Sequence, residues 1–419
     1  MSSGPDPALL LFSYALFLGF VLLVPFAIAG LALINTGLGR SRSAAHSMTS
    51  VLCALAVAML VYFVWGFKIQ GFTPYMEHLG VPPESASAGL FLRGVNGPGA
   101  LTSALLAMFA AGLASLVPLG GGTDRWRLGA TCVSSVLFSG WVYPVFARLV
   151  WHPPQVFGVQ FPHIVDAAGS GVIQATGGLT ALSLAWLLGP RRGKYSSSGM
   201  PAAIPAHNVV FVLFGCLLSW IGWLGLNSAG AILYAGVIPW KAAQVLINTS
   251  FAAAGGGLAA AAITRLRFHR PDASLIANGW VGGLVASSAG CASLKPALAV
   301  LTGLVAGALV VFSVEWLEFH LKVDDPCGSV SVHAVAGIWG LLAAGIFAGE
   351  AGQFMAQLAG VATLLGLVLP MSYGLNWMLG LIVPHRVPRE GERQGLDLHE
   401  LGADAYPEFV VHADELIQR

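Results

Sequence analysis

The sequence predicts an all-α polytopic membrane protein with eleven transmembrane helices, built as an inverted five-helix repeat plus an eleventh helix. The chain of 419 residues is 56% hydrophobic and only 9% charged, whereas about a quarter of the residues in a soluble domain are charged. Runs of about 20 apolar residues, each long enough to cross a bilayer, recur along nearly the whole chain. One polar motif also occurs twice. The surface must therefore face mostly lipid, and a net charge of +1 argues against nucleic acid as a partner.

The apolar runs follow one another with short polar segments between them. They fall near residues 9–34, 47–67, 98–120, 128–147, 166–189, 207–229, 240–264, 274–292, 296–318, 329–348 and 354–383. The last run is too long for a perpendicular helix, so it must tilt or extend beyond the bilayer. Only a loop around 68–97 and the C-terminal tail look soluble. The expected organisation is a membrane domain over 1–383, with repeat one at about 9–189, repeat two at about 207–348 and the last span at 354–383, followed by a tail over 384–419.

Lysine and arginine residues set the expected orientation, because cytoplasmic loops of membrane proteins are enriched in them. With the N-terminus outside, 15 of the 20 Lys and Arg residues lie on the cytoplasmic side and 5 lie outside. The sequence therefore predicts a multi-pass protein of the cell membrane, with its N-terminus outside and its C-terminal tail in the cytoplasm. The first twelve residues carry an acid and no base. We therefore expect the first span to remain as an anchor and not to be cleaved as a signal peptide.

The duplicated motif reads DAAGSGVIQATGG at 166–178 and DPCGSVSVHAVAG at 325–337. Both copies begin with Asp and share Gly and Ser three and four residues later, Ala after nine and Gly after twelve. Eight residues after the Asp, the first copy has Gln174 and the second has His333. Five spans separate the two aspartates, so the copies enter from opposite faces, as in inverted repeats with a site near the midplane.

Eight residues cover about 12 Å of helix, so each of these two side chains is expected close to the midplane. We therefore expect Gln174 and His333 to approach each other at the centre of the membrane. An alternative explanation of the match is chance or small-residue packing, because Gly and Ala are common where membrane helices approach closely.

Four segments carry a resemblance to a known family. They are DAAGSGVI (166–173), WIGWLGLN (220–227), VDDPCGSVSVHAVAGIWG (323–340) and GLDLHELGADAY (395–406). The chain resembles the Amt/Mep/Rh family of ammonium transporters over nearly its whole length, and specifically a divergent bacterial- or archaeal-type Amt member. This resemblance implies a homotrimer with one narrow hydrophobic pore in each subunit for ammonium or ammonia. It implies no enzymatic activity, no cofactor and no metal, and it suggests a PII-type regulatory protein at the cytoplasmic face.

The resemblance also assigns an outer vestibule. Trp151 matches the vestibule tryptophan, where a cation would rest on the indole face; the alternative is a tryptophan that anchors the membrane interface. Phe109 matches the first gate phenylalanine, although a one-residue insertion before Arg125 weakens that alignment. Asp166 matches the aspartate that shapes the vestibule from behind. A carboxylate in a span is usually functional, but Asp166 would also suit a helix N-cap.

Four positions depart from the family pattern. Leu226 stands where the second gate phenylalanine is usual. The vestibule serine position falls near Gly230, with Ser228 displaced, so one acceptor for the bound cation is missing. Five residues before the second motif's histidine, where the family has an acidic residue, this chain has Gly328. Gln174 replaces the first histidine of the pore pair.

The change at Gln174 alters the chemistry expected in the pore. A pair of histidines can relay a proton near neutral pH, whereas glutamine has a donor and an acceptor but does not titrate. We therefore expect slow or electroneutral transport if net charge transport requires that relay. We expect His333 to line the pore. The alternative is that His333 is a core histidine whose ring is hydrogen-bonded to a backbone carbonyl.

Two functions remain open from the sequence. The first is transport of ammonium or ammonia, and the second is an ammonium sensor or receptor with little transport that signals through its tail to a separate partner. An aquaporin-like channel is disfavoured because the chain has no Asn-Pro-Ala pair. An enzyme is disfavoured because we find no GxSxG motif, P-loop or cluster of metal ligands.

Overall fold

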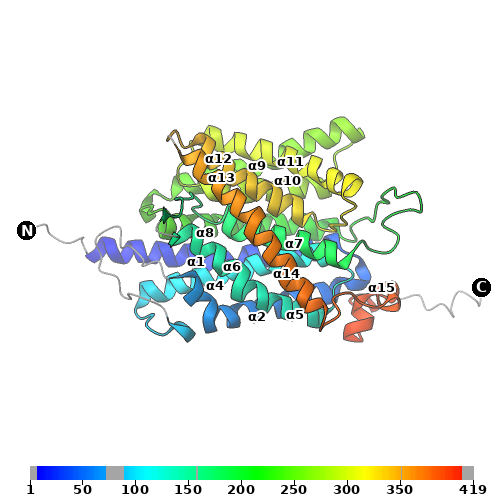
Figure 1. Cartoon of the computed structure of the whole chain (residues 1–419). Coiled ribbons are helices and arrows are strands. Elements are labelled where there is room, and N and C mark those ends of the chain that lie inside the picture. The colour runs from blue at the N-terminus through cyan, green and yellow to red at the C-terminus, as the bar shows by residue number, and fades with distance from the viewer. Residues whose placement is uncertain (1–6, 72–88, 157–158, 351, 408–419) are drawn as a thin grey trace, which may run out of the picture.

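The computed structural model describes residues 7–71, 89–156, 159–350 and 352–407. Figure 1 shows long helices running side by side along a common direction, with α1 beginning at one end and α15 lying at the opposite end. The α-helices are α1 (Pro7–Leu38), α2 (Ala44–Val61), α3 (Phe67–Gln70), α4 (Pro98–Gly122), α5 (Leu128–Leu137), α6 (Tyr143–Trp151), α7 (Thr176–Leu188), α8 (Val209–Tyr234), α9 (Ala243–Phe268), α10 (Ala273–Gly290), α11 (Pro296–His320), α12 (Ala336–Phe347), α13 (Gln353–Thr363), α14 (Leu369–Gly380) and α15 (Arg389–Gln394).

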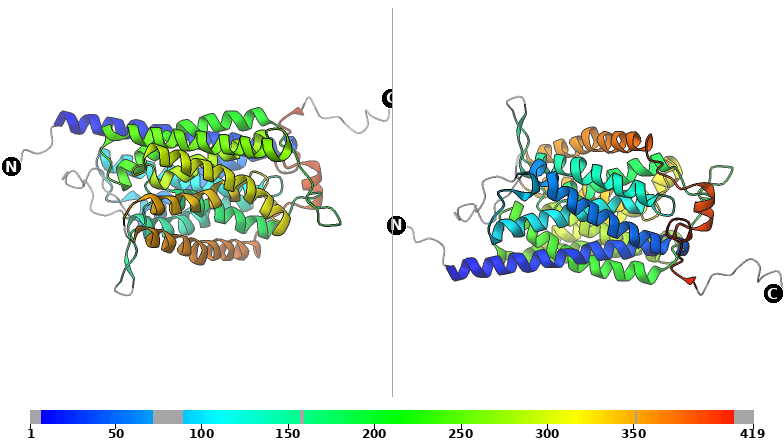
Figure 2. Two further views of the ribbon diagram at one scale, coloured as in Figure 1. Left: turned by 90° about the horizontal axis from the view of Figure 1, so that it is seen from above. Right: turned by 90° about the horizontal axis from the view of Figure 1, so that it is seen from below.

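Short segments of other geometry connect or interrupt these helices. The π-helical segments are η2 (Tyr62–Gly66), η5 (Phe138–Val142), η6 (Ser170–Ala175), η8 (Val330–Val335), η9 (Leu364–Val368) and η10 (Asp397–Leu401). The 3₁₀ turns are η1 (Ser41–Ser43), η4 (Leu90–Leu92) and η7 (Pro239–Lys241). Strands β1 (Gln155–Val156) and β2 (Val159–Gln160) pair antiparallel, and Figure 2 shows them projecting from the end at which α1 begins. That end is termed the Trp151 end, and the opposite one the tail end.

The helices agree with the predicted apolar runs. Within the described residues, ten helical stretches are long and apolar enough to cross a membrane, which confirms the prediction of an all-α, multi-pass chain. Helix α10 coincides with the predicted run 274–292 but is not among those ten. Its apolar character is diluted by Asn278, Ser287 and Ser288, which are buried inside the bundle.

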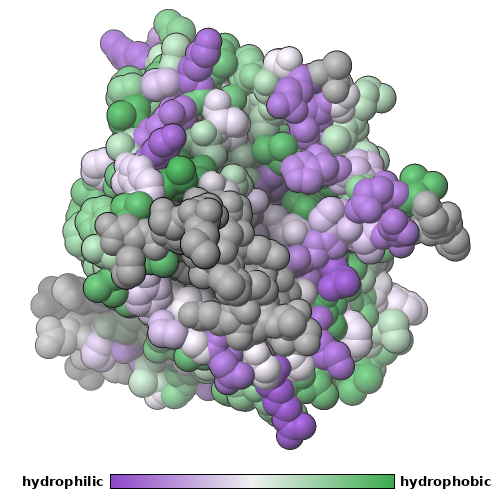
Figure 3. All heavy atoms as spheres, turned by 90° about the vertical axis from the view of Figure 1, so that its left-hand side faces the viewer, coloured by the Kyte–Doolittle hydropathy of each residue, from purple (hydrophilic) through white to green (hydrophobic). Residues whose placement is uncertain are grey.

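The outside of the bundle is strongly apolar. Leu52, Val210, Leu258 and Ile382 are 68–83% exposed. In water such an all-round apolar surface would promote aggregation, whereas lipid solvates it without cost. Figure 3 views the Trp151 end and shows hydrophilic side chains gathered on that end face, with hydrophobic ones toward its margin.

The two halves of the chain pack in corresponding ways. Helix α1 packs along α8, the first helix of the second half. In the first half α4 lies between α2 and α7, and in the second half α10 lies between α9 and α12. This arrangement brings α7 and α12, with the motif segments that precede them, to the centre of the bundle.

Buried charges join the two halves at the tail end. Arg191, which follows α7, donates to Asp124 at 2.8 Å and to Asp324 at 3.0 Å. Arg125 is fully buried and donates to backbone carbonyl oxygens of Gly189 and Asp324. Burial alone would raise the pKa of Asp324, but Arg191 and Arg125 outweigh it and hold that pKa at about 2. Burial lowers the pKa of Arg125 to about 10.

The first part of the tail docks onto this same chain. Asp397 accepts hydrogen bonds from the backbone N–H groups of Ala45 and His46, in the first turn of α2. Glu400 accepts from the backbone N–H of Leu128, the first residue of α5, and bonds the His46 imidazole at 2.9 Å. Carboxylates at helix N-termini satisfy free N–H groups and the helix dipole. Residues 408–419 of the predicted tail lie outside the described residues.

Candidate functional site

Gln174 and His333 lie in direct contact at the centre of the bundle. The Nδ1 atom of His333 is 2.7 Å from the Oε1 atom of Gln174. Both side chains are almost completely buried: His333 is 2% exposed and Gln174 is 0% exposed. They lie in η8 and η6, the two π-helical segments of the duplicated motif. Such π-helical turns occur often at functional sites, because the extra residue per turn redirects a side chain.

The aspartate of each motif copy holds the start of its helical segment. The Asp166 carboxylate accepts from the backbone N–H groups of Gly169, Gly171 and Val172 at 2.9–3.1 Å. The carboxylate thus caps the free N–H groups at the start of η6, from a position before the N-cap residue Gly169, in line with the capping alternative for Asp166. Gly169 takes φ +92°, a left-handed conformation that favours glycine and lets the chain turn into the helix.

The second copy repeats this local geometry. Asp325 accepts from the backbone N–H groups of Ser329 and Val330 at 2.9 and 2.6 Å. Gly328 takes φ +71°, a left-handed conformation like that of Gly169 in the first copy. A β-carbon on Gly328 would also overlap the side-chain amide of Asn278, so a larger residue at this position would require that side chain to move.

The glycine twelve residues after each aspartate allows the two copies to cross. A β-carbon on Gly178 would overlap the backbone nitrogen of Ala334, next to His333. A β-carbon on Gly337 would lie 2.6 Å from the carbonyl oxygen of Ser170 in the first copy. Each glycine therefore packs against the backbone of the other copy, and this close approach brings Gln174 and His333 within hydrogen-bond distance.

The polar pair leaves hydrogen-bonding groups unused. Because an amide oxygen can only accept, His333 carries its proton on Nδ1 and its Nε2 atom keeps a lone pair. Among the described residues, the Nε2 atom of Gln174 and the hydroxyl of Ser331 have no hydrogen-bond partner. Buried polar groups are normally satisfied, so these groups are candidates for contacting a small polar molecule.

Trp151 is the last residue of α6 and lies at the Trp151 end of the bundle. Its indole Nε1 donates to the backbone carbonyl oxygen of Asp166 at 2.8 Å. The ring of Tyr234, the last residue of α8, stacks on the indole with centroids 3.8 Å apart and planes 4° apart. Asp166 is thus close to Trp151, but it contacts the indole through its backbone and not through its carboxylate.

The other vestibule and gate positions lie within the helices. Phe109 is partly buried in α4 and packs against the main core. Leu226 and Ser228 in α8 are buried, and the Ser228 hydroxyl has no partner among the described residues. A β-carbon on Gly230 would lie 2.8 Å from the carbonyl oxygen of Ala167. A serine would therefore not fit at Gly230 without a shift of the backbone.

Sequence reasoning missed Tyr234 and the residues that hold it. Gln70 donates to the Tyr234 hydroxyl at 3.4 Å and accepts from the Tyr62 hydroxyl at 2.6 Å. Tyr62 and Gln70 belong to the second span and Tyr234 to the sixth, so no sequence spacing connects them. An aromatic residue at the end of a membrane helix reads from the sequence as an interfacial anchor.

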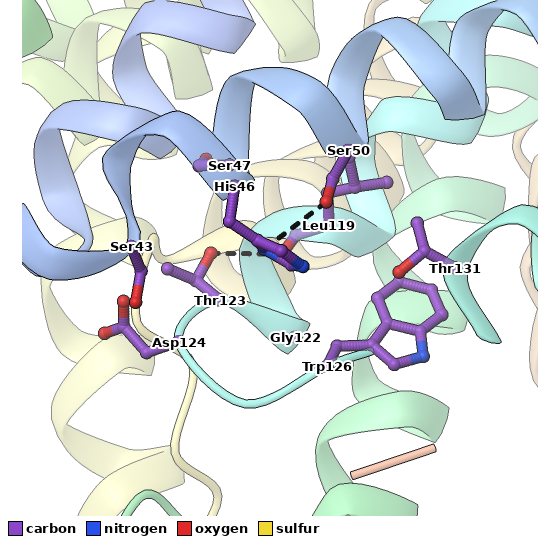
Figure 4. Close-up of a pocket in the computed structure, with 10 residues that line it drawn as sticks. All are labelled: Ser43, His46, Ser47, Ser50, Leu119, Gly122, Thr123, Asp124, Trp126 and Thr131. Carbon is purple, nitrogen blue, oxygen red and sulfur yellow. Dashed lines mark hydrogen bonds between the residues drawn. The ribbon is translucent and has the colours of Figure 1, made fainter. Parts of the chain in front are cut away.

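A small polar cavity lies at the tail end, away from the central pair. Its volume is about 20 Å³, enough for about one water molecule. Figure 4 shows the His46 imidazole and the Ser50 hydroxyl directed toward each other on α2, across from the end of α4. The residues lining it are Ser43, His46, Ser47, Ser50, Leu119, Gly122, Thr123, Asp124, Trp126 and Thr131. His46, which lines this cavity, also bonds Glu400 of the tail. We therefore assign the cavity to the contact between the tail and α2.

Comparison with known proteins decides the family. A sequence model described as the Ammonium Transporter Family matches residues 15–406. The chain belongs to the ammonium transporter family. It is 34% identical to the ammonium transporter Amt2 of Archaeoglobus fulgidus, over 97% of this chain and 90% of the relative. It is 30% identical to Amt1 of Methanocaldococcus jannaschii, over 92% and 95% of the two chains.

Solved structures share the fold of this ammonium transporter family member. A protein described as a Sensor Amt Protein superposes with a TM-score of 0.82 at 26% identity, covering 93% of this chain and 98% of the other. Candida albicans Mep2 superposes with a TM-score of 0.76 at 22% identity, covering 95% and 90%; this likeness shows the fold alone. The curated relatives are named as transporters and not as enzymes, in agreement with the prediction from the sequence.

Proposed function

We propose that this protein carries ammonium or ammonia across a membrane through a pore within each subunit. The observation that carries the proposal is the buried 2.7 Å hydrogen bond between Gln174 and His333, at the crossing of the two motif copies. Relatives named as ammonium transporters match over nearly the whole chain, which supports the substrate. A pore at this crossing would run between the two halves of one chain, as in other membrane proteins built from repeats.

The proposed architecture is eleven spans, with spans one to five and six to ten related as an inverted repeat. The reciprocal packing of Gly178 and Gly337 supports this relation, as does the equivalent capping by Asp166 and Asp325. In the proposed orientation the Trp151 end faces outward and the tail faces the cytoplasm. The excess of Lys and Arg at the tail end supports this orientation.

Ammonium would first bind at the Trp151 end. The negative face of an indole attracts a cation by about 0.5–2 kcal/mol. Gly230 provides no hydroxyl oxygen for the cation, so the aromatic face has to supply a larger share of the binding. Phe109 and Leu226 would then line the apolar entrance, where a charged ion is disfavoured and ammonia is not.

The central pair suits ammonia, which has three N–H donors and one lone pair. The His333 Nε2 lone pair would accept an N–H of ammonia, and the Gln174 Nε2 atom would donate to the ammonia lone pair. Gln174 does not titrate, so a proton cannot pass through both members of the pair. We therefore propose slow or electroneutral transport, in which the proton left at the entrance does not follow through this pair.

An ammonium sensor with little transport is the second candidate. A solved structure described as a Sensor Amt Protein is among the neighbours of this fold. The amide at Gln174 and the missing hydroxyl at Gly230 both favour binding without fast passage. A signal would leave through the tail, which binds the N-terminal turns of α2 and α5.

Two partners are proposed from the family resemblance. We propose a homotrimer, whose pores run through the subunits and not between them, and a PII-type regulatory protein at the cytoplasmic face. The docked tail segment and the exposed basic residues near it form the face that such a regulator would contact. These basic residues include Arg192 and Arg389.

Uptake into proteoliposomes tests the proposed function. Membrane current and internal pH are followed together after ammonium is added, with protein-free liposomes as the control. Transport is expected to alkalinise the interior above the control and to produce little current. His333→Ala should reduce uptake, because the remaining imidazole is lost. Ammonium binding without uptake above the control would instead favour the sensor, and neither binding nor uptake would overturn both candidates.

A further inference from the structure

Tyr234 covers one face of Trp151. The two rings are parallel within 4° and their centroids are 3.8 Å apart, which is van der Waals contact for stacked rings. Nothing can enter between them. A cation that binds to this indole has therefore only the opposite face available. Both residues are partly exposed, so the stack lies where a ligand arriving at the Trp151 end could reach it.

The backbone of Tyr234 is held in place by the way α8 ends. The N–H of Val237 donates to the carbonyl oxygen of Ala231 at 3.0 Å, and Gly236 takes φ +65°. A hydrogen bond that returns from beyond a left-handed glycine to the last turn of a helix caps that turn and restrains it. Tyr234 lies in that last turn, so its α-carbon has little freedom.

The side chain of Tyr234 is held by a chain of hydrogen bonds. Gln70 donates to the Tyr234 hydroxyl at 3.4 Å, and its amide oxygen accepts from the Tyr62 hydroxyl at 2.6 Å. Gln70 and Tyr62 are buried, with exposures of 1% and 0%. The rings of Phe67 and Tyr143 pack edge-on against Tyr62. The second and fourth spans thus hold a ring that belongs to the sixth.

The indole is fixed at its edge as well as on its face. The Nε1–H of Trp151 donates to the Asp166 backbone at 2.8 Å, and the Asp166 carboxylate is itself held by three backbone N–H groups. With one edge and one face held, the indole cannot tilt away from an incoming ligand. A rigid aromatic face discriminates by size, because a bulkier cation can bind only if the ring moves.

We propose that Tyr234 is a positioning and specificity-determining residue of the outer cation site. Its ring backs the indole of Trp151, so that ammonium binds to a single rigid face and bulkier alkylammonium ions bind poorly. The negative face of the second ring adds to the field that the cation meets. This inference rests on the proposed binding of ammonium at Trp151, and it gives the site a second aromatic layer where Gly230 leaves it without a hydroxyl.

The test compares Tyr234→Leu and Tyr234→Phe with the unaltered protein. Ammonium binding is measured by titration calorimetry in detergent, and uptake is measured in proteoliposomes over a range of concentrations. Tyr234→Leu should raise the half-saturating ammonium concentration about threefold, less than the loss of the whole indole because only part of the cation–π site is lost, and leave the maximal rate unchanged. Tyr234→Phe keeps the stacked ring but loses its hydrogen bond from Gln70, so it should lie between the unaltered protein and Tyr234→Leu, within about twofold of the unaltered protein. Tyr373→Leu, at a tyrosine on α14 that is 40% exposed, is the matched control.

A double substitution shows whether Tyr234 acts through Trp151. In a Trp151→Leu background, Tyr234→Leu should have no further effect, because the residue that it positions is gone. Tyr234→Leu should also lower the ratio of the half-saturating methylammonium concentration to that of ammonium. Additive effects of the two substitutions, an unchanged ratio, or a lower maximal rate with unchanged half-saturation would each overturn the inference. Absence of both binding and uptake in the unaltered protein would overturn the proposed function, and this inference with it.

Discussion

At Gln174 the chain has a side chain that forms hydrogen bonds but does not ionise, in contact with the imidazole of His333. If the amide interrupts a proton relay, Gln174→His should raise the ammonium-driven current above that of the unaltered protein. The physical reason is that a second imidazole gives a proton a titratable partner beside His333. The measurement is current across a supported membrane, normalised to the amount of protein.

The matched control for this substitution is Gln174→Asn, which keeps the amide but shortens it. It should leave the current low. A strong current in the unaltered protein that Gln174→His does not change would show that charge crosses by another path, and that the amide acts only as a hydrogen-bonding spacer.

Tyr234 covers one face of the Trp151 indole, so a cation on this ring would have to bind to the opposite face. We expect Trp151→Leu to weaken the apparent ammonium affinity about fivefold, which corresponds to a loss of about 1 kcal/mol of cation–π energy. Binding measured by calorimetry checks this. Trp240→Leu, at a tryptophan that is 43% exposed, should leave the affinity unchanged. Equal affinities for Trp151→Leu and the unaltered protein would mean that Trp151 is only an interfacial anchor.

The residue pairs that could be predicted from the sequence are those that a spacing connects. The contact of Gln174 with His333 could be predicted from two copies of one motif, because copies that are expected to enter from opposite faces would bring equivalent positions to the same depth. The stack of Trp151 on Tyr234 could not be predicted, because it depends on how the fourth and sixth spans end. Asp166 suited two roles in the sequence, and only the hydrogen bonds of its carboxylate show it as a cap.

At the scale of the elements, the crossing of the two motif copies depends on two glycines. Gly178→Ala places a methyl group onto the backbone of Ala334. Overpacking of this kind costs about 1–3 kcal/mol, and here it would also separate Gln174 from His333. We expect a lower thermal unfolding temperature in detergent and a loss of uptake. Gly374→Ala on α14, where a β-carbon meets nothing within 4 Å, should change neither; equal behaviour of the two variants would contradict the close crossing.

The docking of the tail should depend on pH through Glu400. Burial alone would raise the pKa of Glu400, but its hydrogen bonds from His46 and the Leu128 N–H, together with the charge of Arg127, lower it. A carboxyl whose pKa is lowered in the docked state stabilises docking above its ordinary pKa. That stabilisation is lost as the pH falls through the lowered value.

We therefore expect Glu400→Gln to loosen the tail at neutral pH and to remove the loosening of the unaltered tail on acidification. Hydrogen exchange of the peptide covering Asp397–Leu401 measures this, and it should be several-fold faster in Glu400→Gln. Glu390→Gln, at an exposed glutamate of α15, serves as the control. Unchanged exchange in Glu400→Gln would show that Asp397 alone holds the segment.

The helices themselves could be predicted well because lipid requires long apolar runs. The π-helical interruptions could not, because one extra residue in a turn leaves the hydropathy of a run unchanged. Helix α10 is a case in which hydropathy alone underestimates a helix of the bundle. It is less apolar than the other long helices because it is enclosed by protein on several sides, where Asn278, Ser287 and Ser288 are shielded from lipid.

At the scale of the whole molecule, the family resemblance predicts a homotrimer. We expect native mass spectrometry in mild detergent to give three copies of the 43.5 kDa chain. Trp151→Leu and Gln174→His should assemble in the same way, since both residues lie inside one subunit. A monodisperse monomer that still takes up ammonium would contradict the trimer without affecting the proposed pore.

The buried charges at the tail end have a consequence for the transport cycle. Arg191 of the first half is bonded to Asp324 of the second, and both are sealed from water. Opening the halves at this end would strand buried charges, at about 3–5 kcal/mol for a broken buried pair. A carrier that rocks between two states would have to break this Arg191–Asp324 ion pair in every turnover. We therefore expect the proposed pore to work as a fixed conduit, in which substrate on the far side does not accelerate entry from the near side.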